Sequence, residues 1–180
     1  MTAASSDLAA SSDLAALLDR ATEDEARAML TRCCGASRWV AAMLGRRPFG
    51  SDDALLRIAD EEWAHMDRDD VLEALTHHPR IGASMDELRK KYASTAGWSA
   101  GEQSGAAAAD EATLTALRDG NLRYEERFGH VFVVCATGKS AAEMLAILES
   151  RLPNDPDHEW RVAQEEQRKI TRIRLEKLAP

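Results

Sequence analysis

The chain has 180 residues, of which 44% are hydrophobic and 30% charged, and 23 Lys and Arg against 31 Asp and Glu give a net charge of −8. That length is typical of one ordinary domain. Nucleic acid is disfavoured as a partner, because its binding requires clustered Lys and Arg and no stretch of the chain supplies a basic face. No apolar run approaches the roughly 20 residues that span a bilayer, so no membrane partner is predicted.

Residues 3–8 and 9–14 both have the sequence AASSDL, a duplication that does not recur and is therefore not a solenoid repeat. The start of the chain lacks the basic patch and apolar core of a signal peptide. Three cysteines without a CxxC pair indicate a reducing compartment. We expect residues 1–12 to form a flexible leader and residues 13–180 a single domain. The protein is predicted to be cytoplasmic, with an Ala- and Arg-rich composition that suits a bacterium.

Helix signals follow one another closely after the leader. Capping residues and apolar residues spaced three and four apart predict helices that begin near residues 22, 37, 51, 71, 84, 99, 140 and 156. Capping boxes are predicted at Thr22 with Glu25, Ser84 with Glu87, and Ser140 with Glu143.

The middle of the chain holds two less regular features. Gly120 is predicted to interrupt the Ala-rich helix that begins at residue 99, so that a separate helix runs from about residue 121 to 128. Residues 131–136 are apolar and β-branched, but one strand without a partner makes no sheet, so we interpret them as a buried extended or helical segment. The predicted fold class is all-α, a single-domain bundle of about eight helices.

Two familiar motifs are incomplete. Lys139 and Ser140 resemble the end of a phosphate-binding loop, but that loop needs a Gly where this chain has Val133, so a helix start is favoured. The five histidines include no HExxH pattern, and adjacent His77 and His78 would point about 100° apart on a helix. No metal site is predicted.

His78 is the first candidate site residue. Pro79 disfavours the helical conformation in the residue before it, so the helix from residue 71 must end near His78. A helix end leaves carbonyls unpaired and puts a side chain at the edge of the core, where a pocket can open. The alternative is a structural histidine at the helix boundary.

Ser99, Glu102 and Gln103 form the second candidate, because positions i, i+3 and i+4 share one face of a helix. Ser99 and Glu102 also fit a capping box, which is the structural alternative. Both interpretations hold together if the helix N-terminus faces a ligand, since its N–H groups favour an anion.

Arg174 is the third candidate. It belongs to a stripe of the final helix that should be buried, with Trp160, Ala163, Gln167, Ile170 and Leu178. A buried charge needs a partner, so Arg174 either extends to solvent or meets an anion, internal or from a substrate. The sequence leaves these alternatives open.

Five motifs in order together resemble one known family. They are His78-Pro79-Arg80-Ile81-Gly82, Ser99-x-x-Glu102-Gln103, Asn121-x-x-Tyr124-x-x-Arg127-Phe128-Gly129, Phe132-Val133-Val134-Cys135-Ala136 and Lys169-Ile170-x-x-x-Arg174-Leu175. Over about residues 10–178 the chain resembles 2-oxo-4-hydroxy-4-carboxy-5-ureidoimidazoline (OHCU) decarboxylases. Each motif alone is weak, but their order and spacing are specific.

The resemblance implies an all-helical, usually homodimeric enzyme that needs no cofactor and converts OHCU into (S)-allantoin in urate degradation. It implies that His78 is the catalytic histidine and Glu102 the essential carboxylate. The substrate-contacting positions that it implies are Pro79, Ser99, Ala100, Gly101, Glu102, Gln103, the backbone of Phe132, Val133, Val134, Cys135 and Ala136, and Arg174. The chain ends in Lys177-Leu178-Ala179-Pro180 and lacks the peroxisomal ending of many animal relatives.

Two other functions remain open at this stage. In a helical interaction module without enzymatic activity, His78 and Arg174 would be boundary and solvent-reaching residues. A related helical lyase would act on a different small ureido acid.

Overall fold

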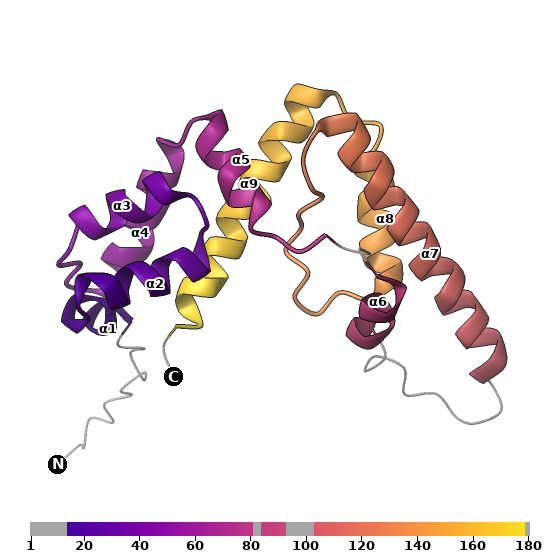
Figure 1. Ribbon diagram of the computed structural model, residues 1–180, viewed down its shortest axis with the longest axis horizontal. Helices are drawn as coiled ribbons and strands as arrows, with labels where there is room; N and C mark the ends of the chain where they lie inside the picture. The colour runs from indigo at the N-terminus through magenta and orange to yellow at the C-terminus, as the bar shows by residue number, and fades with distance from the viewer. Residues whose placement is uncertain (1–13, 81–83, 93–102, 179–180) are drawn as a thin grey trace, which may run out of the picture. The chain divides into compact units, whose positions relative to one another are not determined.

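The computed structural model describes residues 14–80, 84–92 and 103–178, and every regular element in these ranges is a helix (Figure 1). The all-α prediction is confirmed. The chain divides into two compact units, residues 1–70 with 171–180 and residues 71–170, and the divisions fall inside helices α5 and α9. The expected leader lies outside the described residues, and the expectation of a single domain stays a prediction. Among the described helices, none combines the length and apolar character needed to cross a bilayer.

The first unit is built from helices α1 (Leu14–Arg20), α2 (Glu23–Cys33), α3 (Ser37–Gly45) and α4 (Asp52–Ala64). Its fully buried side chains include Leu18, Leu30, Trp39, Met43 and Leu55. The Trp39 indole N–H donates to the carbonyl of Ala59 at 3.1 Å, which ties α3 to α4. Helix α1 was not among the predicted elements.

Helix starts in this unit follow the predicted caps. Thr22 and Glu25 form a full capping box, with the Glu25 amide donating to Thr22 Oγ1 at 3.3 Å. Ser51 Oγ accepts from the Ala54 amide at 3.2 Å at the start of α4. Both predictions are confirmed. Such caps can be predicted from the sequence because they involve only residues within three positions of one another.

The second unit contains α6 (Met85–Tyr92), α7 (Gln103–Phe128), α8 (Ala141–Arg151) and most of α5 (Arg68–Thr76) and α9 (Pro156–Glu176). Figure 1 shows α7 and α8 running alongside each other. Their core cluster consists of Leu88, Leu114, Leu117, Tyr124, Phe132, Val134, Met144 and Leu148. The predicted box at Ser140 and Glu143 is present at the start of α8. Ser84 Oγ accepts from the Asp86 amide at 3.2 Å, and the predicted box with Glu87 stays a prediction because the Glu87 side chain lies outside what the structure describes.

The predicted break at Gly120 is wrong, because α7 continues unbroken from Gln103 to Phe128. A Cβ atom on Gly120 would lie 2.7 Å from Cδ2 of Leu148, a buried residue of α8. The glycine therefore allows close approach of two helices, and the packing offsets its low helix propensity. The helix ends at Phe128, as predicted, and is followed by Gly129, whose φ of 75° lies in the left-handed region.

Residues 131–136 form neither helix nor strand, and Phe132, Val133 and Val134 are buried. Phe132 and Val134 belong to the core cluster between α7 and α8. The prediction of a buried segment outside any sheet is confirmed, in its non-helical form.

Gly120→Ala should destabilise the protein. Overpacking against Leu148 costs about 1–3 kcal/mol, and the gain in helix propensity offsets at most about 1 kcal/mol of it. Gly45→Ala is the matched control, since a Cβ at Gly45 has no atom within 4 Å and Gly45 is also helical. Urea denaturation of both variants measures the difference. Equal stabilisation by the two substitutions would show that Leu148 does not limit the approach.

Candidate active site

His78 lies just beyond the end of α5. The helix stops at Thr76, and the amides of His77 and His78 donate to the carbonyls of Ala74 and Leu75 at 3.2 and 3.1 Å. The helix end predicted from Pro79 is thus confirmed. His77 is exposed and His78 half-buried, so the two adjacent imidazoles have different surroundings.

The His78 ring contacts a buried glutamine of the last helix. Its Nε2 lies 2.5 Å from Oε1 of Gln167, which is 0% exposed. The sequence contained a signal for this residue, because an uncharged polar side chain in a stripe that should be buried needs a hydrogen-bonding partner. Gln167 was recognised as part of that stripe but was not predicted to be a site residue.

A buried ionic network holds the segment 131–136. Arg151 Nε and Nη2 donate to Glu159 Oε1 at 2.8 and 2.5 Å, and its Nη1 donates to the Val133 carbonyl at 2.8 Å. The Tyr124 hydroxyl donates to the same Glu159 oxygen, and Asn154 Nδ2 donates to the other at 2.8 Å. Arg151 is 7% exposed and Glu159 0%. The pair thereby connects α7, α8 and α9 to the backbone of the segment.

Burial raises the pKa of Tyr124 far above its ordinary value, and hydrogen bonding to Glu159 raises it further. The phenol therefore stays protonated and keeps donating to the carboxylate. None of these side chains was predicted to act in a network, because Arg151 and Glu159 meet only after a turn joins α8 to α9.

A second contact fixes the other end of the segment. The Cys135 amide donates to Glu166 Oε2 at 2.7 Å, and Lys169 Nζ lies 2.9 Å from Glu166 Oε1. Burial alone would raise the pKa of Glu166, but the hydrogen bonds from Cys135 and Lys169 outweigh it and hold the pKa below its ordinary range. Because Glu166 and Gln167 are adjacent in α9, one turn of helix holds both the segment and the His78 ring.

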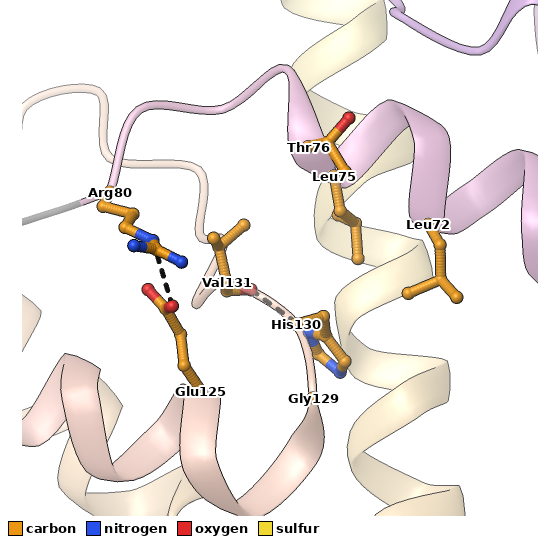
Figure 2. Close-up of a pocket in the computed structure, with 8 residues that line it drawn as sticks. All are labelled: Leu72, Leu75, Thr76, Arg80, Glu125, Gly129, His130 and Val131. Carbon is orange, nitrogen blue, oxygen red and sulfur yellow. Dashed lines mark hydrogen bonds and ion pairs between the residues drawn. The ribbon is translucent and has the colours of Figure 1, made fainter.

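A cavity of about 420 Å³ opens beside the residues that flank His78 (Figure 2). Leu72, Leu75 and Thr76 of α5 line it from one direction. Figure 2 shows Arg80 and Glu125 pointing toward each other across it, with 3.0 Å between Nε and Oε2. Gly129, His130 and Val131 complete the lining.

A second cavity, of about 330 Å³, lies along the other part of the same segment. Its lining comprises Val134, Cys135, Lys139, Ile147, Arg151, Val162, Glu166 and Lys169. Residues 131–135 therefore contribute to the walls of both cavities, with Val131 in the first and Val134 and Cys135 in the second. The segment is well placed to present backbone groups to a small polar molecule.

The other predicted site residues fall in different places. Ser99, Ala100, Gly101 and Glu102 lie outside the described residues, and Gln103 is the first residue of α7. Pro79 is exposed. Of the predicted site, the structure brings His78 and the segment 132–136 to neighbouring residues of α9.

Arg174 lies in the last turn of α9 and belongs to the first unit. It is half-buried, and its Nη1 donates to the carbonyl of Cys33 at 3.4 Å. Burial raises the pKa of the Cys33 thiol to about 12, although the nearby Arg174 charge opposes the rise. The sequence left open whether Arg174 extends to solvent or meets an anion. The structure shows its guanidinium donating to a backbone carbonyl.

The motif at Lys139 and Ser140 is a helix start, as predicted. Ser140 caps α8, with its Oγ accepting from the Glu143 amide at 3.3 Å. Within the described ranges, His, Cys, Asp and Glu side chains form no group of three that could ligate a metal ion.

Small cavities lined by an irregular backbone segment and by charged side chains are typical of sites that bind small molecules. Comparison with known protein families identifies the class of protein, because residues 19–176 match the OHCU decarboxylase family. The chain belongs to that family.

Individual relatives agree with this placement. The uric acid degradation bifunctional protein TTL of Arabidopsis thaliana is 36% identical over 148 residues, which are 81% of this chain and 45% of that protein. The 2-oxo-4-hydroxy-4-carboxy-5-ureidoimidazoline decarboxylase of Amia calva is 42% identical over 69 residues, 38% of each protein. The chain thus spans less than half the length of these curated relatives.

Two solved structures share the fold. A crystal structure of an OHCU decarboxylase in the presence of (S)-allantoin superposes with a TM-score of 0.68 at 30% identity, covering 88% of this chain and 98% of that one. A crystal structure of an (S)-allantoin synthase gives a TM-score of 0.64 at 19% identity, over 91% of this chain and 53% of that one. At this identity the second similarity supports the fold alone.

Glu159→Gln should destabilise the protein by about 3–5 kcal/mol, because it leaves the Arg151 charge buried without a counter-ion. Glu23→Gln is the matched control, since Glu23 pairs with Arg27 at an exposed site and such pairs contribute about 0–1 kcal/mol. Chemical denaturation of both variants measures the difference. Similar small losses in both would mean that the buried pair does not organise the second unit.

The contribution of Glu166 to stability should depend on pH. Its pKa is lower in the folded protein than the ordinary 4.5, so the stabilisation is present above about pH 4.5 and disappears as pH falls through the folded value. Thermal unfolding of the protein and of Glu166→Gln between pH 3 and 7 should show a difference at neutral pH that shrinks in acid. A constant difference would contradict the assignment.

Proposed function

We propose that this protein decarboxylates OHCU to (S)-allantoin, with His78 as the residue that moves the proton. Family membership and the 30% identical OHCU decarboxylase structure, which the chain covers almost entirely, support this activity. The single structural observation that carries the site is the placement of His78 and of residues 131–136 against adjacent residues of α9. Homodimerisation and a cytoplasmic location remain predictions.

The chemistry of the substrate explains what the protein must supply. OHCU has a carboxylate and a hydroxyl on one ring carbon, next to a C=N bond. When the bond to the carboxylate breaks and CO₂ leaves, its electron pair forms a C=C bond to the neighbouring carbon, and the C=N electrons move onto the nitrogen, which takes up a proton from solvent. The hydroxyl then loses its proton to become a carbonyl, and the neighbouring carbon takes up a proton on one face. The substrate carries its own electron sink, so orientation and stereospecific proton transfer suffice.

His78 is suited to this proton transfer because imidazole both accepts and donates a proton near neutral pH. In the proposed mechanism it takes the proton of the ring hydroxyl as CO₂ departs. Glu102, with Ser99 and Gln103, holds the nitrogens of the ring and the ureido group. Arg174 would bind an anionic or carbonyl oxygen of the substrate.

The backbone of Phe132 to Ala136 would pair with the remaining amide groups of the ring. Not every backbone group of the segment is available to a substrate, because the single hydrogen of the Cys135 amide already bonds to Glu166. The Val133 carbonyl accepts from Arg151 and keeps a second lone pair. Substrate contacts are therefore expected at carbonyl oxygens and at amides of the segment other than that of Cys135.

The test is the stereochemistry of allantoin formed from freshly generated OHCU, followed by circular dichroism. Spontaneous decay gives a racemate, whereas the enzyme should give one enantiomer at an accelerated rate. His78→Asn should lower the rate about 10²–10⁴-fold, the usual contribution of general acid–base catalysis. His77→Asn is the matched control and should keep full activity, because His77 is exposed beside the same helix end.

Three outcomes of this assay would contradict specific parts of the proposal. Racemic product at the spontaneous rate with the unmodified protein would rule out the activity and favour an interaction module. Full activity of His78→Asn would remove His78 from the mechanism, and full activity of a folded Glu102→Gln would remove Glu102. Faster turnover of a different ureido acid would identify a related lyase.

A further inference from the structure

The contact between His78 and Gln167 determines which ring nitrogen carries the hydrogen. His78 Nε2 lies 2.5 Å from Oε1 of Gln167, and an amide oxygen only accepts hydrogen bonds. With Oε1 as the atom that faces the ring, Nε2 is the nitrogen that carries the hydrogen in neutral His78. Nδ1 then carries the lone pair.

Gln167 is held firmly enough to impose this choice. It is 0% exposed in the 21-residue helix α9, and the preceding Glu166 binds the Cys135 amide at 2.7 Å. His78, in contrast, lies beyond the last residue of α5 and is followed by Pro79, so no helical turn of its own sets the ring. A contact with a residue 89 positions away in the chain holds its Nε2.

We propose that Gln167 is a positioning residue that holds His78 in the Nε2–H tautomer and orients the ring for proton exchange with the substrate. The ring orientation stands on the contact itself, whereas the exchange with substrate rests on the proposed function. The carboxamide acts here as an oriented acceptor of the kind that fixes histidine tautomers in other catalytic sites.

The tautomer is measured directly by ¹⁵N nuclear magnetic resonance of the protein labelled at its five histidines. The signals of His78 are those that disappear in His78→Asn. Without substrate, at a pH where the ring is neutral, we expect a protonated Nε2 and an unprotonated Nδ1. The opposite pattern, with hydrogen on Nδ1, would overturn the proposal.

Gln167→Met keeps the length of the side chain and removes the amide acceptor. It should give a mixture of the two tautomers and lower kcat about fivefold to tenfold, the effect of losing one hydrogen bond, with KM changed less than twofold. Gln164→Met, the same change one turn earlier in α9, is the matched control and should retain the tautomer and kcat. A pure Nε2–H ring in a folded Gln167→Met protein would show that Gln167 only packs, which contradicts the proposal.

Gln167→Glu provides the second variant, since a carboxylate oxygen in the same place still accepts from Nε2. It should retain the Nε2–H tautomer where Gln167→Met does not, and loss of the tautomer in both would contradict the role of the acceptor. If Gln167→Met fails to fold, the ¹⁵N spectra of the unmodified protein and of Gln167→Glu still test the proposal, because both should show hydrogen on Nε2 of His78. Failure of the proposed function is distinguishable, because it would show as an active His78→Asn protein while the tautomer measurement is unaffected.

Discussion

The buried ion pair of Arg151 and Glu159 is the interaction on which the second unit depends. A pair removed from water is stable only when every remaining donor and acceptor is satisfied. Here Tyr124, Asn154 and the Val133 carbonyl complete it. The ion pair needs these groups as hydrogen-bonding partners. Conversely, the Val133 carbonyl can be buried outside regular structure only because a donor satisfies it.

This constraint explains why a segment without regular structure can be part of a packed core. Phe132 and Val134 fill the space between α7 and α8, while Arg151 and Glu166 supply polar partners to the backbone between them. The segment is thus anchored from two helices. A backbone held in this way keeps its remaining polar groups in fixed directions, which is what recognition of a small planar ring requires.

Local features of the fold were predictable and contacts between helices were not. Thr22, Ser51 and Ser140 begin helices as expected, because capping is settled within one turn. Gly120 was misinterpreted for the converse reason: its effect depends on Leu148 of a different helix, which no local pattern reveals. Similarly, Pro79 correctly predicted where α5 ends, but the orientation of the His78 ring depends on Gln167.

The sequence by itself determined the helical class, the helix ends around His78 and the family, because these follow from short-range rules and from ordered motifs. The prediction that Ser99 to Glu102 are site residues rests on the sequence alone. Only the tertiary structure decided that Arg151, Glu159, Glu166 and Gln167 hold the segment 131–136 and the His78 ring, since each acts through a partner at least eight residues away. The physical reason is that a polar residue in a pattern of buried positions indicates that its side chain needs a hydrogen-bonding partner, but the sequence does not indicate which residue that partner is.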